Sequence, residues 1–150
     1  GSAQHRVAVA AAGRQRLTGK RRFVNHRRPI AGCDDRAVDL DRGRIRWRVP
    51  AGESPDGVQG LFSYGPALVT AGGLVFHAGS RDLHLRAHDA DTGAVLARLA
   101  LPAGLHAGPI TYSVRPGGRQ YLVVAPGGHV GIGSTLGDHV IAYALPDDPV

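Results

Sequence analysis

The sequence predicts an all-β chain, and three observations support this prediction. Its 150 residues include 22 Gly and 10 Pro, a content that is typical of many short strands joined by tight turns. The stretch AVDLDRGRIRW, which begins at Ala37, returns in part fifty residues later as AHDADTGAVLA at Ala87. A repeat of this period is typical of propellers, solenoids and arrays. In the stretches RIRWRV and DLHLRAH, which begin at Arg44 and Asp82, apolar and polar residues alternate with period two, which is the pattern of a strand.

The first copy predicts a hairpin whose second strand is buried on one face. In Arg44–Val49, arginines alternate with Ile45, Trp47 and Val49, so we expect these apolar side chains to face the interior. Trp47 is the single tryptophan of the chain, and we expect it to wedge against a neighbouring blade. The second copy has Ala97 at the equivalent position, so the hairpin is expected there without the wedge.

Both copies begin with the same kind of turn. Asp39–Gly43 reads DLDRG and Asp89–Gly93 reads DADTG. An Asp at the start of a turn bonds to its own downstream backbone, and Gly supplies the positive φ of a tight hairpin. We therefore assign the repeated aspartates to turn formation and not to catalysis. A further alternating stretch, Asp82–His88, predicts a strand with one solvent-facing and one buried side.

The turns and strands group into propeller blades. A complete four-stranded unit lies between Pro66 and Leu101, and four antiparallel strands in about 40 residues form one blade. A second unit begins at Pro109 and shows three strands, and Ala37–Pro50 supplies the last two strands of a preceding unit. The predicted fold is a partial β-propeller of about two and a quarter blades. Closed propellers have about four to eight, so we expect the open edges to associate with another chain or another copy.

Charge divides the chain in two. Residues 1–48 carry thirteen Lys and Arg against four acidic residues, hence +9, and residues 49–150 carry five against eight, hence −3. No strand–turn–strand pattern is visible in residues 1–36, which we predict to be a basic, irregular or disordered segment preceding the partial propeller over 37–150. A basic run can bind phosphates, but it offers one aromatic residue, Phe23, for base stacking. A nucleic-acid-binding arm is therefore a weaker alternative, and we expect no nucleic-acid partner.

Other sequence features exclude several classes of protein. A single cysteine, Cys33, excludes an internal disulfide framework. No apolar run approaches the ~20 residues of a membrane span, and no signal-peptide pattern is present. His77, His84 and His88 do not have the spacing of a metal site, so we expect them on the surface or between blades. No Ser/His/Asp arrangement or phosphate-binding loop stands out.

Several stretches carry a resemblance to a known family. AVDLDRGRIRW resembles the tryptophan-docking repeat of quinoprotein dehydrogenases. The succession GPALVTAGGLVFHAGSRDLHLRAHDADTG, LPAG, GPITYSV, GRQYLVVAPGGH and LGDHVIAYALPDD is similar to the C-terminal end of membrane-bound PQQ-dependent glucose dehydrogenases and their quinate/shikimate relatives. The resemblance covers about Ala37 to Asp148, and residues 1–36 are expected to lie outside it.

The resemblance implies a function as well as a fold. It implies an eight-bladed propeller that holds PQQ on its axis with a divalent ion, usually Ca²⁺. The implied reaction oxidises a hydroxyl of an aldose or polyol and passes electrons to ubiquinone, at the periplasmic face of the bacterial inner membrane. The catalytic Asp and the metal ligands are implied to lie in upstream blades. We therefore expect no catalytic or metal-ligating residue in this chain, and no activity from the chain by itself.

The resemblance also implies which residues lie near the cofactor. Small residues let a backbone approach a planar ring, and an apolar side chain packs on its face. The starts of the two innermost strands are Leu61–Pro66 and Leu105–Pro109, and Gly127–His129 is similar to the family as well. The predicted cofactor-binding residues are Leu61, Phe62, Ser63, Tyr64 and Gly65. Two alternatives stay open: these are plain turns at strand starts, or the propeller is a non-catalytic scaffold for protein contacts.

Overall fold

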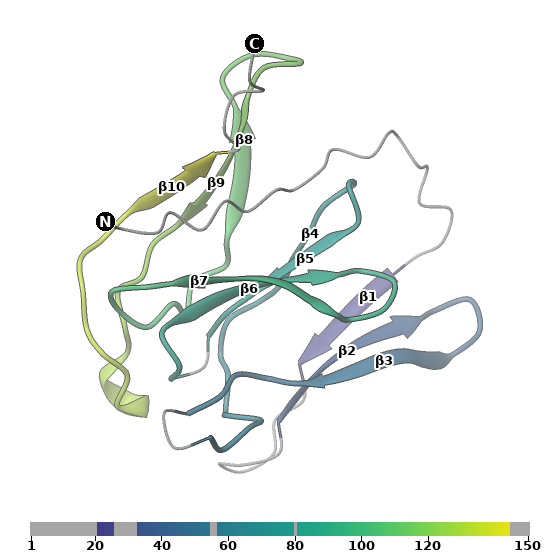
Figure 1. Ribbon diagram of the computed structural model, residues 1–150, viewed down its shortest axis with the longest axis horizontal. Helices are drawn as coiled ribbons and strands as arrows, with labels where there is room; N and C mark the ends of the chain where they lie inside the picture. Colours follow the sequence, from purple (N-terminus) through teal and green to yellow (C-terminus); the bar gives the residue numbers. More distant parts are fainter. Residues whose placement is uncertain (1–20, 26–32, 55–56, 80, 145–150) are drawn as a thin grey trace.

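The computed structural model describes residues 21–25, 33–54, 57–79 and 81–144. For residues 21–25 it describes the backbone. Within these ranges, ten strands form three antiparallel sheets that lie side by side in chain order (Figure 1). In each sheet every strand pairs with its neighbour in the sequence. This up-and-down arrangement is that of propeller blades, so the predicted all-β class and partial propeller are confirmed.

The bounds of the strands are as follows. The first sheet contains β1 (Arg21–Asn25), β2 (Asp34–Asp39) and β3 (Arg44–Pro50). The second contains β4 (Leu68–Val69), β5 (Leu74–His77), β6 (His84–Asp89) and β7 (Val95–Ala100). The third contains β8 (Ile110–Ser113), β9 (Gln120–Val124) and β10 (Ile141–Ala144), with a short 3₁₀ helix, η1 (Val130–Ile132), between the last two strands.

The first sheet corrects the predicted start of the propeller. It has three strands where two were predicted, because β1 pairs with β2 over five residue pairs and β2 already begins at Asp34. Residues 21–25 and 34–36 are therefore strand and not irregular, and the rest of the prediction for residues 1–36 lies outside the described residues. β1 reads RRFVN, in which apolar and polar residues do not alternate, so this pattern does not indicate a strand.

The two copies of the repeat form equivalent hairpins. Asp39 Oδ1 and Asp89 Oδ1 each accept hydrogen bonds from the backbone N–H groups two and three residues downstream. Gly43 and Gly93 have φ of +63° and +77°, a region that is open to glycine. The predicted assignment of these aspartates to turn formation therefore agrees with their hydrogen bonds.

A bulge at the same place in both hairpins changes which side chains are buried. The pairing skips Arg46 in β3 and Leu96 in β7, fifty residues apart. An extra residue breaks the period-two alternation of a strand. The prediction that Ile45 faces the interior is therefore wrong: its side chain is 51% exposed, whereas Trp47 is 7% exposed.

Trp47 joins the first sheet to the second. Its Nε1–H donates a hydrogen bond to the Ala90 carbonyl, 3.0 Å away, in the turn between β6 and β7. A Cβ placed on Gly93 would lie 2.7 Å from Cδ2 of the indole, so the ring packs directly on the glycine backbone. The His88 ring lies nearly parallel to the indole, with 6.3 Å between the centroids. The prediction that Trp47 wedges against a neighbouring blade agrees with these contacts.

The two faces of the second sheet differ in character. One face joins a buried apolar cluster shared with the third sheet, through Phe76, Leu85 and Ala87. The opposite face carries His77, Arg86 and His88, which are 3%, 6% and 1% exposed. The prediction of a solvent-facing side for Asp82–His88 is therefore wrong. The first sheet covers this side, and Arg86 is buried there in an ion pair with Asp82.

Replacing Gly93 by Ala is expected to destabilise the fold more than replacing Gly43 by Ala. Both glycines have positive φ, so an alanine at either position costs about 1–2 kcal/mol of backbone strain. A Cβ at Gly43 meets no atom within 4 Å, whereas a Cβ at Gly93 collides with Trp47. Overpacking of this kind adds about 1–3 kcal/mol, which urea unfolding of the two variants would measure.

The same pair of substitutions can be repeated in a Trp47→Ala background. In that background the two glycine substitutions should lower the free energy of unfolding equally, because the ring that collides with a Cβ at Gly93 is gone. Equal losses for the two glycine variants in the presence of Trp47 would show that the indole does not pack on Gly93.

Candidate functional site

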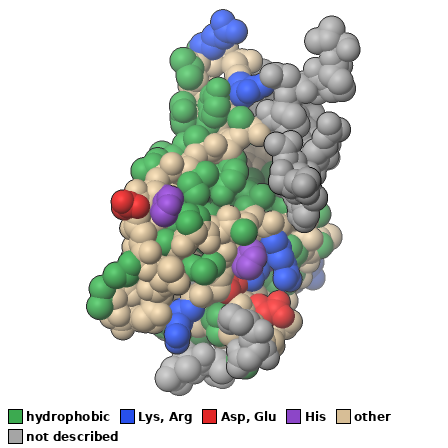
Figure 2. Space-filling view, turned by 60° about the vertical axis from the view of Figure 1, so that its left-hand side comes forward, with side chains coloured by type: hydrophobic (Ala, Val, Ile, Leu, Met, Phe, Trp, Pro, Cys, Tyr) green, Lys and Arg blue, Asp and Glu red, His purple; other side chains and the backbone are tan. Residues whose placement is uncertain are grey.

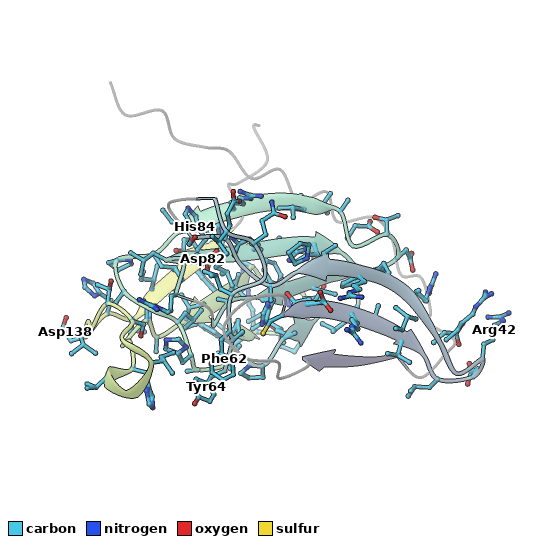
Figure 3. The ribbon with its side chains drawn as sticks, turned by 90° about the horizontal axis from the view of Figure 1, so that it is seen from below. Arg42, Phe62, Tyr64, Asp82, His84 and Asp138 are labelled. Atoms are coloured by element: carbon cyan, nitrogen blue, oxygen red, sulfur yellow. The ribbon has the colours of Figure 1, made fainter. Side chains whose placement is uncertain are left out.

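Three segments that are distant in the sequence meet at the inner ends of the second and third sheets. They are Leu61–Gly65 before β4, Leu105–Pro109 before β8, and the loop after β9 that contains His129. Figure 3 shows Phe62 and Tyr64 next to each other at this end, with Arg42 at the far tip of the first hairpin. The segments predicted to lie near a cofactor are therefore neighbours in space.

Four rings form the exposed surface of this site, and we call them the ring cluster: Phe62, Tyr64, His106 and His129. Tyr64 is 46% exposed and lies at the centre of the cluster. Its ring centroid is 4.7 Å from Phe62, 6.4 Å from His106 and 5.8 Å from His129. The two imidazoles are 6.2 Å apart, edge to face. Such a cluster can pack against a flat aromatic ligand.

The backbone carbonyl of Gly79 holds two of these segments. It accepts the N–H of Tyr64 at 3.1 Å and Nδ1–H of His106 at 3.0 Å. Gly65 packs backbone to backbone against Gly79, since a Cβ on Gly79 would lie 2.2 Å from the Gly65 nitrogen. The start of β4 is therefore held tightly against the end of β5, and Gly65 serves close packing within the chain.

The protonation of His106 follows from its hydrogen bonds. Because a carbonyl can only accept, Nδ1 carries the hydrogen, and Nε2 accepts from Ser134 Oγ at 2.9 Å. The same Oγ accepts the backbone N–H of His129 at 2.7 Å. Burial holds the pKa of His106 below its ordinary value. His106 is thus a neutral ring that ties the loop around His129 to the second sheet.

The five residues predicted to bind a cofactor lie differently in the site. Phe62 and Tyr64 belong to the ring cluster, and Leu61 is half-buried. Ser63 and Gly65 are buried: Ser63 Oγ donates to the Ala78 carbonyl, and Gly65 packs against the backbone of Ala78 and Gly79. His106 and His129 were not among the predicted residues. They stand within LHAGP and GGH, which are the segments that could have indicated them.

A Ser–His–Asp chain runs beneath this surface, although none was visible in the sequence. Ser63 Oγ lies 3.3 Å from His77 Nε2, and His77 Nδ1 lies 2.6 Å from Asp35 Oδ2. The three side chains come from separate parts of the chain, so no local motif indicated them. They are between 1% and 5% exposed, and Ser63 Oγ also donates to the Ala78 carbonyl at 3.2 Å. A nucleophile must reach its substrate, so this arrangement is internal and not a hydrolase site.

The described residues offer no group of three or more His, Cys, Asp or Glu side chains that could hold a metal ion. In the same part of the chain, no helix has the length and apolar character that crossing a membrane requires. The described site thus presents ring faces and backbone groups.

Comparison with known proteins decides the family. Residues 10–122 match the family model "PQQ: Glucose/ethanol/alcohol dehydrogenase, beta-propeller domain". The chain belongs to this quinoprotein dehydrogenase family. The match begins at residue 10, so the prediction that residues 1–36 lie outside the resemblance is wrong for residues 10–36.

Individual relatives agree with this assignment. The chain is 43% identical over 122 residues to "Probable quinate dehydrogenase (quinone)" of Xanthomonas campestris pv. juglandis, covering 74% of this chain and 15% of that protein. It is 37% identical over 123 residues to "Quinoprotein glucose dehydrogenase" of Escherichia coli (strain K12), covering 75% and 15%. The quinoprotein segment therefore spans about 15% of the length of these relatives.

Solved structures show the same fold. The quinohemoprotein alcohol dehydrogenase ADHIIG from Pseudomonas putida HK5 superposes with a TM-score of 0.58 at 28% identity, covering 75% of this chain and 17% of that chain. The quinohemoprotein alcohol dehydrogenase from Comamonas testosteroni gives 0.54 at 25% identity, covering 77% and 17%. The segment is thus a piece of a quinoprotein propeller.

The stability of the chain should decrease as the pH falls below the ordinary imidazole pKa of about 6.5. His106 has a lowered pKa in the folded state, so the unfolded chain binds a proton that the folded chain does not, and acid favours unfolding. A His106→Gln variant has no imidazole at this position to bind the proton. Its free energy of unfolding, measured by urea titration, should therefore decrease less between pH 7.5 and pH 5. Part of the pH dependence should remain in this variant, because burial also lowers the pKa of His88.

An unchanged slope in His106→Gln would contradict the assignment of a neutral, carbonyl-bound His106. The matched variant His88→Gln should also flatten the curve, because His88 donates its Nδ1–H to the Gly93 carbonyl at 3.1 Å in the same way.

Proposed function

We propose that the chain is the C-terminal part of a PQQ-dependent dehydrogenase that oxidises a hydroxyl of an aldose or polyol and passes the electrons to ubiquinone. Membership of the quinoprotein family supports the cofactor, and the names of the relatives, a quinate dehydrogenase (quinone) and a glucose dehydrogenase, support the substrate class and the acceptor. The observation that carries the proposal is the ring cluster at the inner ends of two blades.

The ring cluster fits one part of PQQ. PQQ is a planar quinone that carries carboxylates, and the exposed ring of Tyr64, tilted by 37° to His129, offers it a face. In this proposal Leu61–Gly65 forms one wall of the cofactor site. The cluster contains no Lys or Arg, so the partners of the carboxylates, and the ligands of a Ca²⁺ ion, would come from other blades of a longer protein.

The chain's own residues would bind and orient the cofactor. PQQ, when bound, supplies the acceptor for the two electrons of the alcohol. Tyr64 and Phe62 would pack on the ring and exclude water from it, and the Gly79 carbonyl keeps the wall in place through Tyr64 and His106. The catalytic Asp is proposed to lie outside this chain, which spans about 15% of its relatives. The chain by itself would then not turn over substrate.

The third sheet supports a role as part of a larger assembly. Its exposed apolar side chains are extensive (Figure 2), with Ile110, Tyr112, Val114 and Val140 between 45% and 82% exposed. Large exposed apolar patches mark contact surfaces. We propose that a further blade, or a second copy of the chain, covers this surface, and that the assembly works at the periplasmic face of the bacterial inner membrane.

The isolated chain is expected to bind PQQ weakly in the presence of Ca²⁺ and to show no sugar-dependent dye reduction. It would supply one wall of the site without the charged partners, and incomplete positioning removes most catalysis. Isothermal titration with PQQ and a dye assay with glucose would measure both. Tight binding together with glucose-dependent turnover would contradict the proposal that the catalytic groups lie elsewhere.

A non-catalytic scaffold is the alternative that the same experiment tests. A chain that folds, gives no signal with PQQ at any concentration and forms a stable complex with another protein would favour the scaffold over the cofactor wall.

A further inference from the structure

The wall segment Leu61–Gly65 is held from behind by a buried histidine. His77 lies at the end of β5 and is 3% exposed. Its Nε2 lies 3.3 Å from Ser63 Oγ and 3.3 Å from the Gly65 carbonyl, so one nitrogen contacts two residues of the wall. Its Nδ1 lies 2.6 Å from Asp35 Oδ2, in β2 of the preceding blade. His77 therefore connects the wall to a different blade.

The hydrogen-bond partners determine where the hydrogens of this ring lie. Asp35 Oδ2 accepts from Nδ1–H. The Gly65 carbonyl can only accept, and the single hydrogen of Ser63 Oγ is directed at the Ala78 carbonyl, 3.2 Å away. Nδ1 therefore carries a hydrogen, and Nε2 lies between the Gly65 carbonyl and the Ser63 hydroxyl, so the ring contacts Asp35 with one nitrogen and the wall with the other.

Arg86 and His88, the other charged or titratable groups on this face, have contacts of their own. Arg86 of β6 is paired with Asp82. His88 of β6 donates Nδ1–H to the Gly93 carbonyl, and burial lowers its pKa, so it is a neutral ring. Asp35 is thus the carboxylate that the described contacts assign to His77.

We propose that His77 and Asp35 are positioning residues, and that their buried hydrogen bond fixes the wall segment Leu61–Gly65 in place through Ser63 and Gly65. This rests on the proposed function for the role of the wall, but the contact itself does not depend on it. The consequence is that a side chain of one blade sets the position of the cofactor-facing segment of the next. The wall keeps its shape only while the two blades stay docked.

The hydrogen bond between His77 and Asp35 can be measured on the full chain. Proton–nitrogen correlation spectra of ¹⁵N-histidine-labelled protein should show an Nδ1–H signal of His77 that exchanges slowly with solvent, assigned by its loss in His77→Gln. The absence of this signal would overturn the bond to Asp35.

The positioning role can be measured by amide hydrogen exchange at Tyr64, whose N–H bonds to the Gly79 carbonyl. The Thr70 amide, which bonds to the Leu74 carbonyl in the β4–β5 hairpin, is the internal reference. Asp35→Asn keeps the shape of the side chain and removes its charge. It should speed exchange at Tyr64 about tenfold relative to Thr70, because the wall loosens locally.

Asp34→Asn is the matched control. Asp34 is the adjacent residue of β2, is 7% exposed, and pairs with Arg36 and Arg48 instead of a histidine. Any loss of overall stability in this variant should change the amide exchange rates of Tyr64 and Thr70 by the same factor. The positioning role would be overturned if the ratio of the Tyr64 rate to the Thr70 rate did not change in Asp35→Asn. It would also be overturned if this ratio changed by the same factor in Asp34→Asn. PQQ binding does not enter these measurements, so a failure of the proposed function would be seen separately.

Discussion

The packing of Trp47 on Gly93 is the contact on which the arrangement of the first two blades depends. The indole meets the glycine backbone and donates to the Ala90 carbonyl, and both partners lie in the turn of the next blade. Only a residue without a side chain leaves room for the ring. The Asp89 carboxylate shapes the same turn by accepting two backbone N–H groups. One local turn therefore serves as both the reversal of its own hairpin and the docking surface for its neighbour.

The two interfaces between blades are stabilised by different kinds of interaction. Between the second and third sheets, apolar side chains such as Leu85 and Val124 form a continuous buried cluster. Between the first and second, the indole covers a layer of buried polar groups that includes His77 and Asp35. Apolar contacts are non-directional, whereas hydrogen bonds require a defined distance and angle. The polar interface also reaches the ring cluster, because Ser63 lies between Phe62 and Tyr64 in the sequence and contacts His77.

Much of the fold could be predicted from sequence, because its signals are local. The Asp/Gly turns and the alternation of the strands involve neighbouring residues, and the fifty-residue repeat shows the same local pattern twice. These signals indicated the blades and the wedge at Trp47. The bulge at Arg46 could not be predicted from alternation, so Ile45 was misplaced. The burial of Arg86 and the assembly of Ser63, His77 and Asp35 depend on how separate blades meet. For the site, family resemblance indicated Tyr64 and its segment, and the imidazoles of His106 and His129 emerged from packing.

The central claim is that a quinone cofactor meets this chain at the ring cluster. Its most direct test is a titration of the ¹⁵N-labelled chain with PQQ, followed by the chemical shifts of the backbone amides. The account predicts shifts confined to Tyr64, His106, His129 and their neighbours, with none in the hairpin Asp39–Gly43 at the opposite end (Figure 3). Shifts centred on that hairpin, or scattered over the whole surface, would contradict it.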